Sequence, residues 1–471
     1  MSILRSLSML ALVAFTMAQG TEARDNFLVI LADDLGVDAV GVYSRDDLYG
    51  HPGEGASPGP TPWIDQLAAN GILFRNAYSS PTCAPTRAST LTGRFPFRIG
   101  IGEPEGAQLS IEETLLPEVL ASTHRNGVAG KWHIGNNSDI DHPIDSGFDA
   151  YAGPLSGSVP SYFSWPKTTN SSTSAGSTQS GFATYVTTDN VNEAIDLING
   201  FGDEPWFVWL AFTAPHTPFH APPAALISAD VNDQSPAEDL YRAAVEAMDT
   251  EIGRLLQAIP AAVLADTTIF FVGDNGSPRR AVVPPFVASR AKGTVYEGGV
   301  NVPFIVQSPW IDPADEGSES LALVHTLDIF ATLTEIAGQP NPAEDSVSLL
   351  PYLQDPTLPT RSSRPYAYAE RFSPNGEPPY DTVERAIRGE RFKLIWRDGV
   401  DEELFDLSLD PFEAVNLLLS LPLEPDAETA FNALSAAMET LHTSSIFRNG
   451  FESGGVDAWS AANEPDRTDA R

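Results

Sequence analysis

The chain has 471 residues, 42% of them hydrophobic, which is enough for one large folded unit and a smaller one. It carries 63 acidic and 27 basic side chains, a formal net charge of −36, which argues against nucleic acid or an anionic membrane as a partner. Its single cysteine, Cys83, excludes an intramolecular disulfide, and beyond the N-terminus no apolar stretch is long enough for stable membrane insertion.

Residues 1–23 are typical of a secretory signal peptide. Arg5 precedes an apolar run over residues 7–18, and small residues suitable for cleavage follow at 18–20 and 21–23. The run is too short to favour the alternative, an N-terminal membrane anchor. We therefore expect a secreted or periplasmic protein, whose stability comes from its core without disulfides.

The first predicted strand covers residues 26–32, Asn-Phe-Leu-Val-Ile-Leu-Ala, because a continuous apolar run is typical of a central strand in a parallel sheet. Asp33 and Asp34 follow it directly. At the carboxyl end of a strand both carboxylates can converge, and open α/β sheets bind ligands at that edge. Adjacent carboxylates repel, so a shared cation is one reason to hold them together; a solvated turn is the alternative.

A helix over residues 62–69 and a strand over 72–77 lead into residues 79–94, Ser-Ser-Pro-Thr-Cys-Ala-Pro-Thr-Arg-Ala-Ser-Thr-Leu-Thr-Gly-Arg. Pro85 favours the first turn of a helix, which places Cys83 at the positive end, where a thiolate or an anion is stabilised. Arg87, one turn later, points back toward the same place. The alternative is a buried cysteine that only precedes a short helix.

The next strand ends are also followed by polar side chains. An amphipathic helix is expected over residues 112–125 and a strand over 127–131, after which Lys131 and His133 share one face of an extended backbone. His216 lies between prolines just after the predicted strand 206–212. A solvent-facing pair and a structural turn are the respective alternatives.

Residues 154–181 are rich in Ser, Thr, Gly and Pro and are interpreted as one long loop, followed by a helix over 183–199. A helix over 241–256 and a strand over 267–272 then lead to Asp274 and Asn275, which add oxygen ligands at the same predicted edge. Residues 277–292 contain no acidic residue and carry four basic ones: Arg279, Arg280, Arg290 and Lys292.

The pattern changes after a strand over residues 302–307 and a helix over 321–336. Short strands are expected at 366–370, 386–389, 392–397 and 403–407, with a closing helix over 427–441. The predicted fold is α/β: a large, mostly parallel mixed sheet sandwiched by helices, plus a smaller C-terminal antiparallel sheet with a helix. The expected divisions are a signal peptide (1–23), an N-terminal α/β domain that holds the candidate site residues (24–345), a small C-terminal α+β subdomain (346–443) and a tail (444–471).

The segment around the cysteine fits the pattern C-x-P-x-R-x-x-x-x-T-G, filled by Cys83, Pro85, Arg87, Thr92 and Gly93. This pattern resembles the signature of the type I sulfatases, of the alkaline-phosphatase superfamily. In that family a formylglycine-generating or equivalent maturation enzyme oxidises the cysteine to formylglycine, which works as a hydrated aldehyde. Thr86 stands where serine is common in the motif; it keeps the hydroxyl and adds a methyl group.

The resemblance extends over nearly the whole chain and implies a role for each polar residue above. Asp33, Asp34, Asp274 and Asn275 match the calcium ligands of the family, and residue 83 completes the set. Hard oxygen ligands suit Ca²⁺, with Mg²⁺ as the alternative, better than zinc. Lys131, His133, His216 and Lys292 match the remaining pocket residues, and residues 404–413 resemble the small C-terminal domain of the family.

The implied reaction is hydrolysis of a sulfate monoester, either an aryl sulfate or a sulfated carbohydrate. One hydroxyl of the hydrate attacks sulfur, helped by the metal and Arg87; His216 or Lys292 assists the leaving group, and Lys131 orients the reactants. His133 then deprotonates the second hydroxyl, sulfate leaves and the aldehyde returns. The alternatives are a phosphonate monoester or phosphodiester hydrolase of the same superfamily and an unmodified protein that only binds a sulfated ligand.

Overall fold

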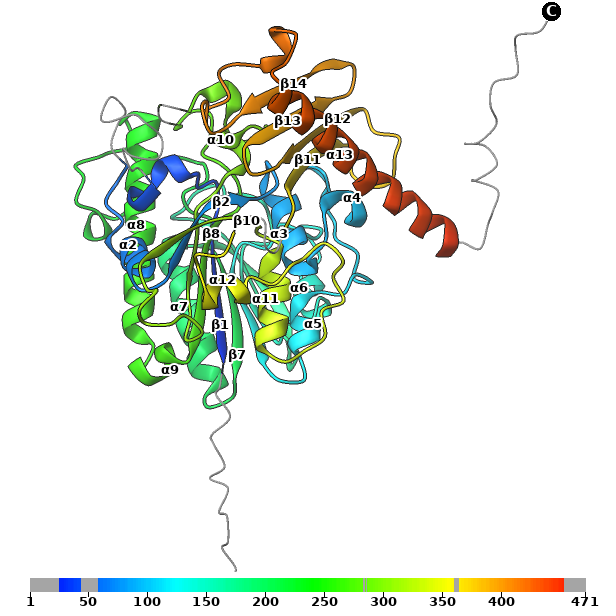
Figure 1. Ribbon diagram of the computed structural model, residues 1–471. Coiled ribbons are helices and arrows are strands. Elements are labelled where there is room, and N and C mark those ends of the chain that lie inside the picture. Colours follow the sequence, from blue (N-terminus) through cyan, green and yellow to red (C-terminus); the bar gives the residue numbers. More distant parts are fainter. Residues whose placement is uncertain (1–24, 44–57, 283, 285, 360–363, 453–471) are drawn as a thin grey trace, which may run out of the picture.

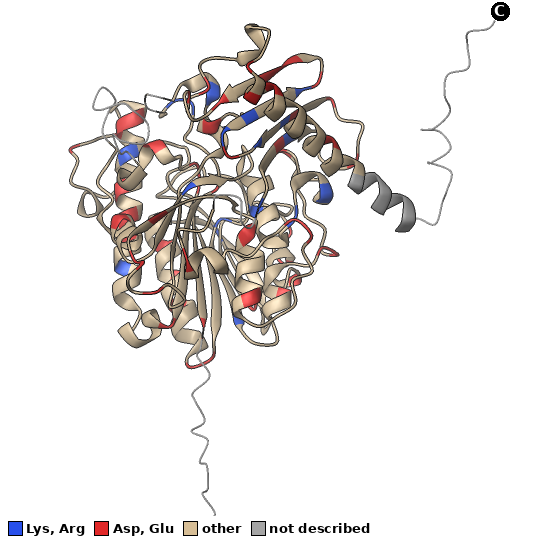
Figure 2. Cartoon of the chain, viewed as in Figure 1, with Lys and Arg blue, Asp and Glu red and all other residues tan. Residues whose placement is uncertain are grey.

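The computed structural model describes residues 25–43, 58–282, 284, 286–359 and 364–452, with side chains described as far as residue 443. The predicted signal peptide (1–23) and the part of the predicted tail after residue 452 lie outside the described residues. Among the helices that are described, none combines the length and the apolar character needed to cross a bilayer. Acidic residues are spread over both parts of the fold, and basic residues are fewer (Figure 2).

A ten-stranded mixed sheet forms the centre of the larger part, in the order β10-β2-β9-β8-β1-β7-β3-β4-β5-β6 (Figure 1). Its strands are β1 (Asn26–Ala32), β2 (Ile72–Tyr78), β3 (Arg125–Gly130), β4 (Ala150–Gly153), β5 (Trp165–Ser171), β6 (Ser174–Phe182), β7 (Trp206–Ala211), β8 (Thr267–Gly273), β9 (Phe304–Gln307) and β10 (Ser318–His325). The central strands β8, β1, β7, β3 and β4 pair with one another in parallel, and they are flanked by β9 on β8 and by β5 on β4, both antiparallel. The predicted fold class is confirmed.

Helices cover both faces of this sheet (Figure 1). They are α2 (Pro62–Ala69), α3 (Cys83–Thr92), α4 (Pro96–Ile99), α5 (Leu116–Leu120), α6 (His142–Asp145), α7 (Val186–Phe201), α8 (Ala237–Ala258), α9 (Ala261–Ala265), α10 (Glu297–Val300), α11 (Asp328–Ile336) and α12 (Leu350–Gln354). Alternate residues of β1 point to opposite faces. Phe27 and Leu31 pack in the core with α3, α5 and α11, whereas Leu28 and Ile30 pack in the core with α2, α7 and α8.

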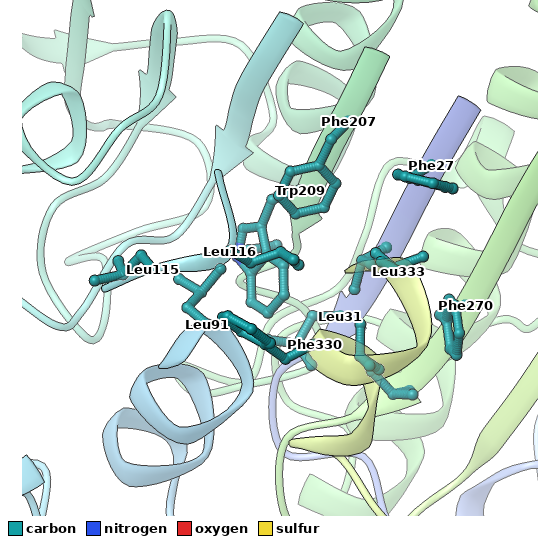
Figure 3. Packing of buried hydrophobic residues seen from close by; sticks show 14 of the residues in the cluster. Phe27, Leu31, Leu91, Leu115, Leu116, Phe207, Trp209, Phe270, Phe330 and Leu333 are labelled. Carbon is teal, nitrogen blue, oxygen red and sulfur yellow. The ribbon is translucent and has the colours of Figure 1, made fainter. Parts of the chain in front are cut away.

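The first of these cores fixes the helix that carries Cys83. Leu91, near the end of α3, packs among Trp209 of β7, Leu116 of α5 and Phe330 of α11 (Figure 3). All four side chains are buried. Because close-packed side chains resist displacement, the amino end of α3 is held at a fixed place beyond the sheet.

The C-terminal part is the predicted four-stranded antiparallel sheet with one long helix. It contains β11 (Ala367–Ser373), β12 (Thr382–Arg388), β13 (Phe392–Arg397), β14 (Val400–Asp406) and α13 (Pro425–Glu452). Leu434 and Met438 of α13 pack on Leu394 and Leu404 of the sheet. The predicted division at residues 345 and 346 stays a prediction; Leu353 still packs in the core of the large sheet, which favours a later boundary.

Three sequence predictions of secondary structure are wrong. The β5–β6 hairpin covers residues 165–182, of which 165–181 were expected within a loop; polar residues suit the exposed edge of a sheet. The first part of the expected helix 321–336 is strand β10, since pairing with β2 overrides its helical pattern. Of the expected helix 112–125, only residues 116–120 are helical, as α5. Its start is fixed by Pro117 and by the Glu118 side chain, which accepts a hydrogen bond from the Leu115 amide.

A buried group of charges joins the two parts of the fold. The Lys393 ammonium of β13, which is fully buried, contacts Glu297 Oε1 at 3.0 Å and Glu413 Oε1 at 2.9 Å. Arg388 Nη1 lies 3.0 Å from Glu297 Oε2, and the Tyr78 hydroxyl also donates to Glu297. Burial raises the pKa of Glu413 to about 7, against the opposing charge of Lys393.

Replacing Lys393 with methionine is expected to lower the free energy of unfolding by about 3–5 kcal/mol, because two buried carboxylates lose their shared partner. Denaturant unfolding of the variant measures this. Arg391→Met is the matched control: the Arg391 side chain is 43% exposed in its pair with Asp406, so we expect a much smaller cost than for Lys393→Met. Equal effects of the two substitutions would contradict this role for Lys393.

Candidate active site

The predicted site residues lie beyond the carboxyl ends of four neighbouring strands. Strand β1 pairs with β8 on one side and with β7 on the other, and β7 pairs with β3. The pairing continues past the strand ends, where the Asp33 amide donates to Ala214 O and the Asp274 amide to Ala32 O. Lys131 is held the same way, through Ala211 O at 2.8 Å. The parallel register therefore brings the residues after β1, β3, β7 and β8 to one crevice.

Cys83 is the first residue of α3, and its side chain is 2% exposed. Its Sγ atom lies 3.4 Å from Nδ1 of His133. The Thr86 hydroxyl donates to Thr82 O at 3.1 Å and lies 3.2 Å from Ser80 O, so this residue stabilises the turn just before the cysteine. Threonine therefore supplies in this position the hydroxyl that serine would supply.

Arg87 is buried one turn after Cys83 and connects three of the strand ends. Its Nε donates to Asp274 Oδ2 at 3.1 Å and its Nη1 to the carbonyl oxygen of Lys131 at 2.8 Å. Its Nη2 lies 4.0 Å from Asp33 Oδ1. Although burial opposes it, the charges of Asp274 and Asp33 raise the pKa of Arg87, so the guanidinium stays charged in the crevice.

The carboxylates around Cys83 fit a hard metal ion. One ligand atom each of Asp33, Cys83 and Asp274 lie within 4.8 Å of one another. Two buried oxygens there, Asp33 Oδ1 and Asn275 Oδ1, accept no hydrogen bond from the described residues. Burial raises the pKa of both Asp33 and Asp274 to about 6, reinforced in each case by neighbouring carboxylates. A cation of the Ca²⁺ or Mg²⁺ class would offset that repulsion, and such ions prefer oxygen ligands.

Asp34 accepts contacts from several directions and has a positive φ of 68°. Its Oδ1 accepts from Asn275 Nδ2 at 2.9 Å and from the Lys292 ammonium. Burial acts to raise the pKa of Asp34, but the charges of Lys292 and His216 outweigh it and lower the pKa. Burial acts to lower the pKa of Lys292, but the negative charge of Asp34 outweighs it and raises the pKa, so Lys292 stays an ammonium. Tyr241 fixes this turn by donating to Asp34 O at 2.7 Å.

Burial lowers the pKa of both histidines of the site. Burial first, and then the charges of Lys131 and Arg87, keep the pKa of His133 well below its usual value, so this ring is neutral and able to accept a proton. The Lys131 ammonium itself lies 2.5 Å from Asp33 Oδ2. His216 lies 2.7 Å from Thr217 O through Nδ1, which therefore carries a proton, and its Nε2 lies 3.8 Å from Asp34 Oδ2.

The structure brings all ten predicted residues into one connected site. They are Asp33, Asp34, Cys83, Arg87, Lys131, His133, His216, Asp274, Asn275 and Lys292. Their catalytic and metal-binding roles stay predictions. Sequence reasoning did not single out Tyr241, Gly157 or Tyr162. Tyr241 lies on α8 and the other two in the segment after β4, and no local motif marks their contacts with the site. Arg279 and Arg280, in the basic segment, are exposed and form no ion pair with the described residues.

Cys83, several buried carboxylates and several basic side chains thus converge at one edge of the sheet, an arrangement that suits binding of a tetrahedral anion. A family model described as Sulfatase matches residues 25–339, and one described as N-sulphoglucosamine sulphohydrolase, C-terminal, matches residues 290–442. N-acetylgalactosamine-6-sulfatase of Homo sapiens is 30% identical over 379 residues, which cover 71% of this chain and 67% of that protein.

Two further similarities agree with these matches. Arylsulfatase G of Rattus norvegicus is 28% identical over 393 residues, 72% of this chain and 70% of that protein. The crystal structure of Ps i-CgsB in complex with k-i-k-neocarrahexaose is 25% identical and superposes with a TM-score of 0.71, covering 88% of this chain and 92% of that one.

Proposed function

The chain belongs to the sulfatase family, and from that premise we propose that it hydrolyses sulfate monoesters through a formylglycine made from Cys83. By family it is a sulfuric ester hydrolase. The observation that carries the finer proposal is the position of residue 83. It lies at the amino end of α3, within reach of His133 and beside the carboxylates that suit a hard cation.

The conversion of Cys83 turns its CH₂SH group into an aldehyde: the oxygen atom comes formally from water, hydrogen sulfide leaves, and two protons and two electrons pass to an oxidant that a maturation enzyme supplies. A hydrated aldehyde offers two hydroxyl groups, one to attack sulfur and one to lose its proton so that sulfate can leave. A Ca²⁺ or Mg²⁺ ion held by Asp33, Asp34, Asp274, Asn275 and residue 83 would supply positive charge to the sulfate oxygens.

The chain's own side chains perform the remaining work. Arg87 and Lys131 are buried basic side chains that both approach Asp33; Arg87 favours ionisation of the nucleophile and Lys131 orients the anion. His133 is neutral and 3.4 Å from the Cys83 Sγ position, so it accepts the proton whose loss expels sulfate. Lys292 or His216, which both contact the Asp34 carboxylate, supplies a proton to the leaving-group oxygen.

The proposed substrate is a sulfated small molecule or saccharide. N-acetylgalactosamine-6-sulfatase and the oligosaccharide complex of Ps i-CgsB support the saccharide class, because they are among the similar proteins. The predicted export of the protein stays a prediction, since its signal peptide lies outside the described residues. The maturation enzyme is a partner that this proposal requires.

Hydrolysis of 4-nitrophenyl sulfate and 4-nitrophenyl phosphate tests the proposal with one leaving group. We expect kcat/KM for the sulfate to exceed that for the phosphate by at least about a hundredfold, since the charge of the anion is what the site would select. Protein in which Cys83 is replaced gives the background rate. A faster reaction with the phosphate, or with a phosphonate monoester, would assign the chain to the alternative chemistry of the same superfamily.

A further inference from the structure

We propose that residues 154–164, the segment between β4 and β5, position both active-site histidines through two separate contacts, Gly157 with His133 and Tyr162 with His216. We call this segment the strap. The inference rests on the proposed function, in which the two histidines serve different steps. Gly157 and Tyr162 are positioning residues, because neither touches the reacting atoms in this arrangement.

The first contact holds His133. The backbone of the strap accepts hydrogen bonds from the Trp132 amide at Pro154 O, 3.1 Å, and from the His133 amide at Leu155 O, 3.0 Å. The chain then folds back so that Gly157 lies directly against the imidazole. A Cβ atom at position 157 would overlap with Nε2 and Cε1 of His133. Only glycine therefore leaves the ring in the place where Nδ1 faces residue 83.

The second contact holds the turn that carries His216. The Tyr162 hydroxyl lies 2.8 Å from Thr213 O and 2.7 Å from His216 O, and it donates its proton to these two carbonyl oxygens. Burial keeps the pKa of Tyr162 well above its usual value, so the hydroxyl remains a donor. The ring is itself fixed by His220, which stacks on it with 4.0 Å between centroids.

The strap is anchored at both ends and in the middle. It follows directly after β4, its Val159 side chain is buried in the core, and Tyr162 O accepts the Val186 amide at the start of α7. A rigid segment that contacts both histidines fixes the distance between them. Loss of the contact with His216 is therefore expected to slow departure of the leaving group, and loss of the contact with His133 to slow release of sulfate. In each case the rate of the other step should remain unchanged.

Tyr162→Phe tests the contact with His216. We expect kcat for a sulfate ester with a poor leaving group, such as an alkyl or sugar alcohol, to fall about tenfold or more, with little change in KM. For 4-nitrophenyl sulfate, whose leaving group needs little protonation, we expect a change of less than about twofold. Tyr185→Phe is the control. It removes a neighbouring hydroxyl that hydrogen-bonds His220 and does not contact His216, so kcat for both substrates should change little.

Gly157→Ala tests the contact with His133. Because His133 serves the release of sulfate, the first turnover of 4-nitrophenyl sulfate should remain fast while later turnovers slow about tenfold or more. Stopped-flow absorbance should then show a burst of nitrophenol of about one per active site. Gly200→Ala, where a Cβ meets nothing within 4 Å, is the matched control and should show no burst.

A readout independent of turnover comes from the imidazole NMR signals, assigned with His133→Ala and His216→Ala. Gly157→Ala should shift the signals of His133 and not those of His216, and Tyr162→Phe should do the reverse. Equal loss of rate with both leaving groups, absence of a burst, or unchanged histidine signals would overturn the proposal. If the unaltered protein hydrolyses no sulfate ester, the proposed function fails, whereas the NMR test of the strap still stands.

Discussion

Replacing Cys83 with alanine is expected to abolish hydrolysis of sulfate esters, by about four orders of magnitude or more, while the fold remains intact. The alanine methyl group cannot be converted to an aldehyde, so both hydroxyl groups of the proposed nucleophile are lost. The structural cost is small, about 1 kcal/mol, because the side chain removed is a single buried thiol at the start of α3. Steady-state turnover and a thermal melt of the same preparation measure the two effects.

Ser89→Ala is the matched control for this substitution. Ser89 is buried on the same helix, and its hydroxyl has no hydrogen-bond partner among the described residues. Its replacement should leave turnover nearly unchanged. Retained turnover in the Cys83→Ala variant would rule out residue 83 as the nucleophile, whatever the state of the fold.

Replacing Asp274 with asparagine is expected to lower metal content and turnover together, with turnover falling by about three orders of magnitude. The carboxylate is fully buried, close to Asp33 and residue 83, and its charge is the main attraction that this side chain offers to a cation. Metal analysis of dialysed protein, with turnover measured on the same sample, follows both quantities. A metal-free preparation with full activity would refute the metal site.

Asp328→Asn separates this effect from a loss of stability. Asp328 is a second fully buried carboxylate and pairs with Arg364, as Asp274 pairs with Arg87. Both substitutions break a buried ion pair, so both should lower the melting temperature. Only the Asp274 variant should lose its metal, because Asp328 lies at the start of α11, away from the other proposed ligands.

The central part of the fold could be predicted because its strands are continuous apolar runs. Residues 27–32 and 206–211 are apolar throughout, and they lie in the adjacent buried strands β1 and β7. The outer strands carry no such signal. Strand β6 is exposed along almost its whole length, and β10 is a strand only because β2 lies beside it. Such pairings over long sequence distances leave no trace in local composition.

The site residues could be named because they follow strand ends and because the cysteine motif resembles a known signature. Their backbone geometry could not be predicted. Asp34 and His133 both have positive φ angles, of 68° and 63°, which is uncommon for residues other than glycine. The contacts of Gly157 with His133 and of Tyr162 with the carbonyl of His216 could not be predicted either, because they depend on the path of one loop in space. No spacing within residues 154–164 indicates such contacts.

The mass of the tryptic peptide that spans residues 76–87, taken from protein made in its natural host, tests the central claim most directly. Conversion of the Cys83 side chain from CH₂SH to an aldehyde removes about 18 mass units. We expect the lighter peptide to predominate in active protein. A peptide with its thiol quantitatively intact, in material that turns over sulfate esters, would contradict the proposed nucleophile; the same thiol in material without turnover would favour a protein that binds a sulfated ligand.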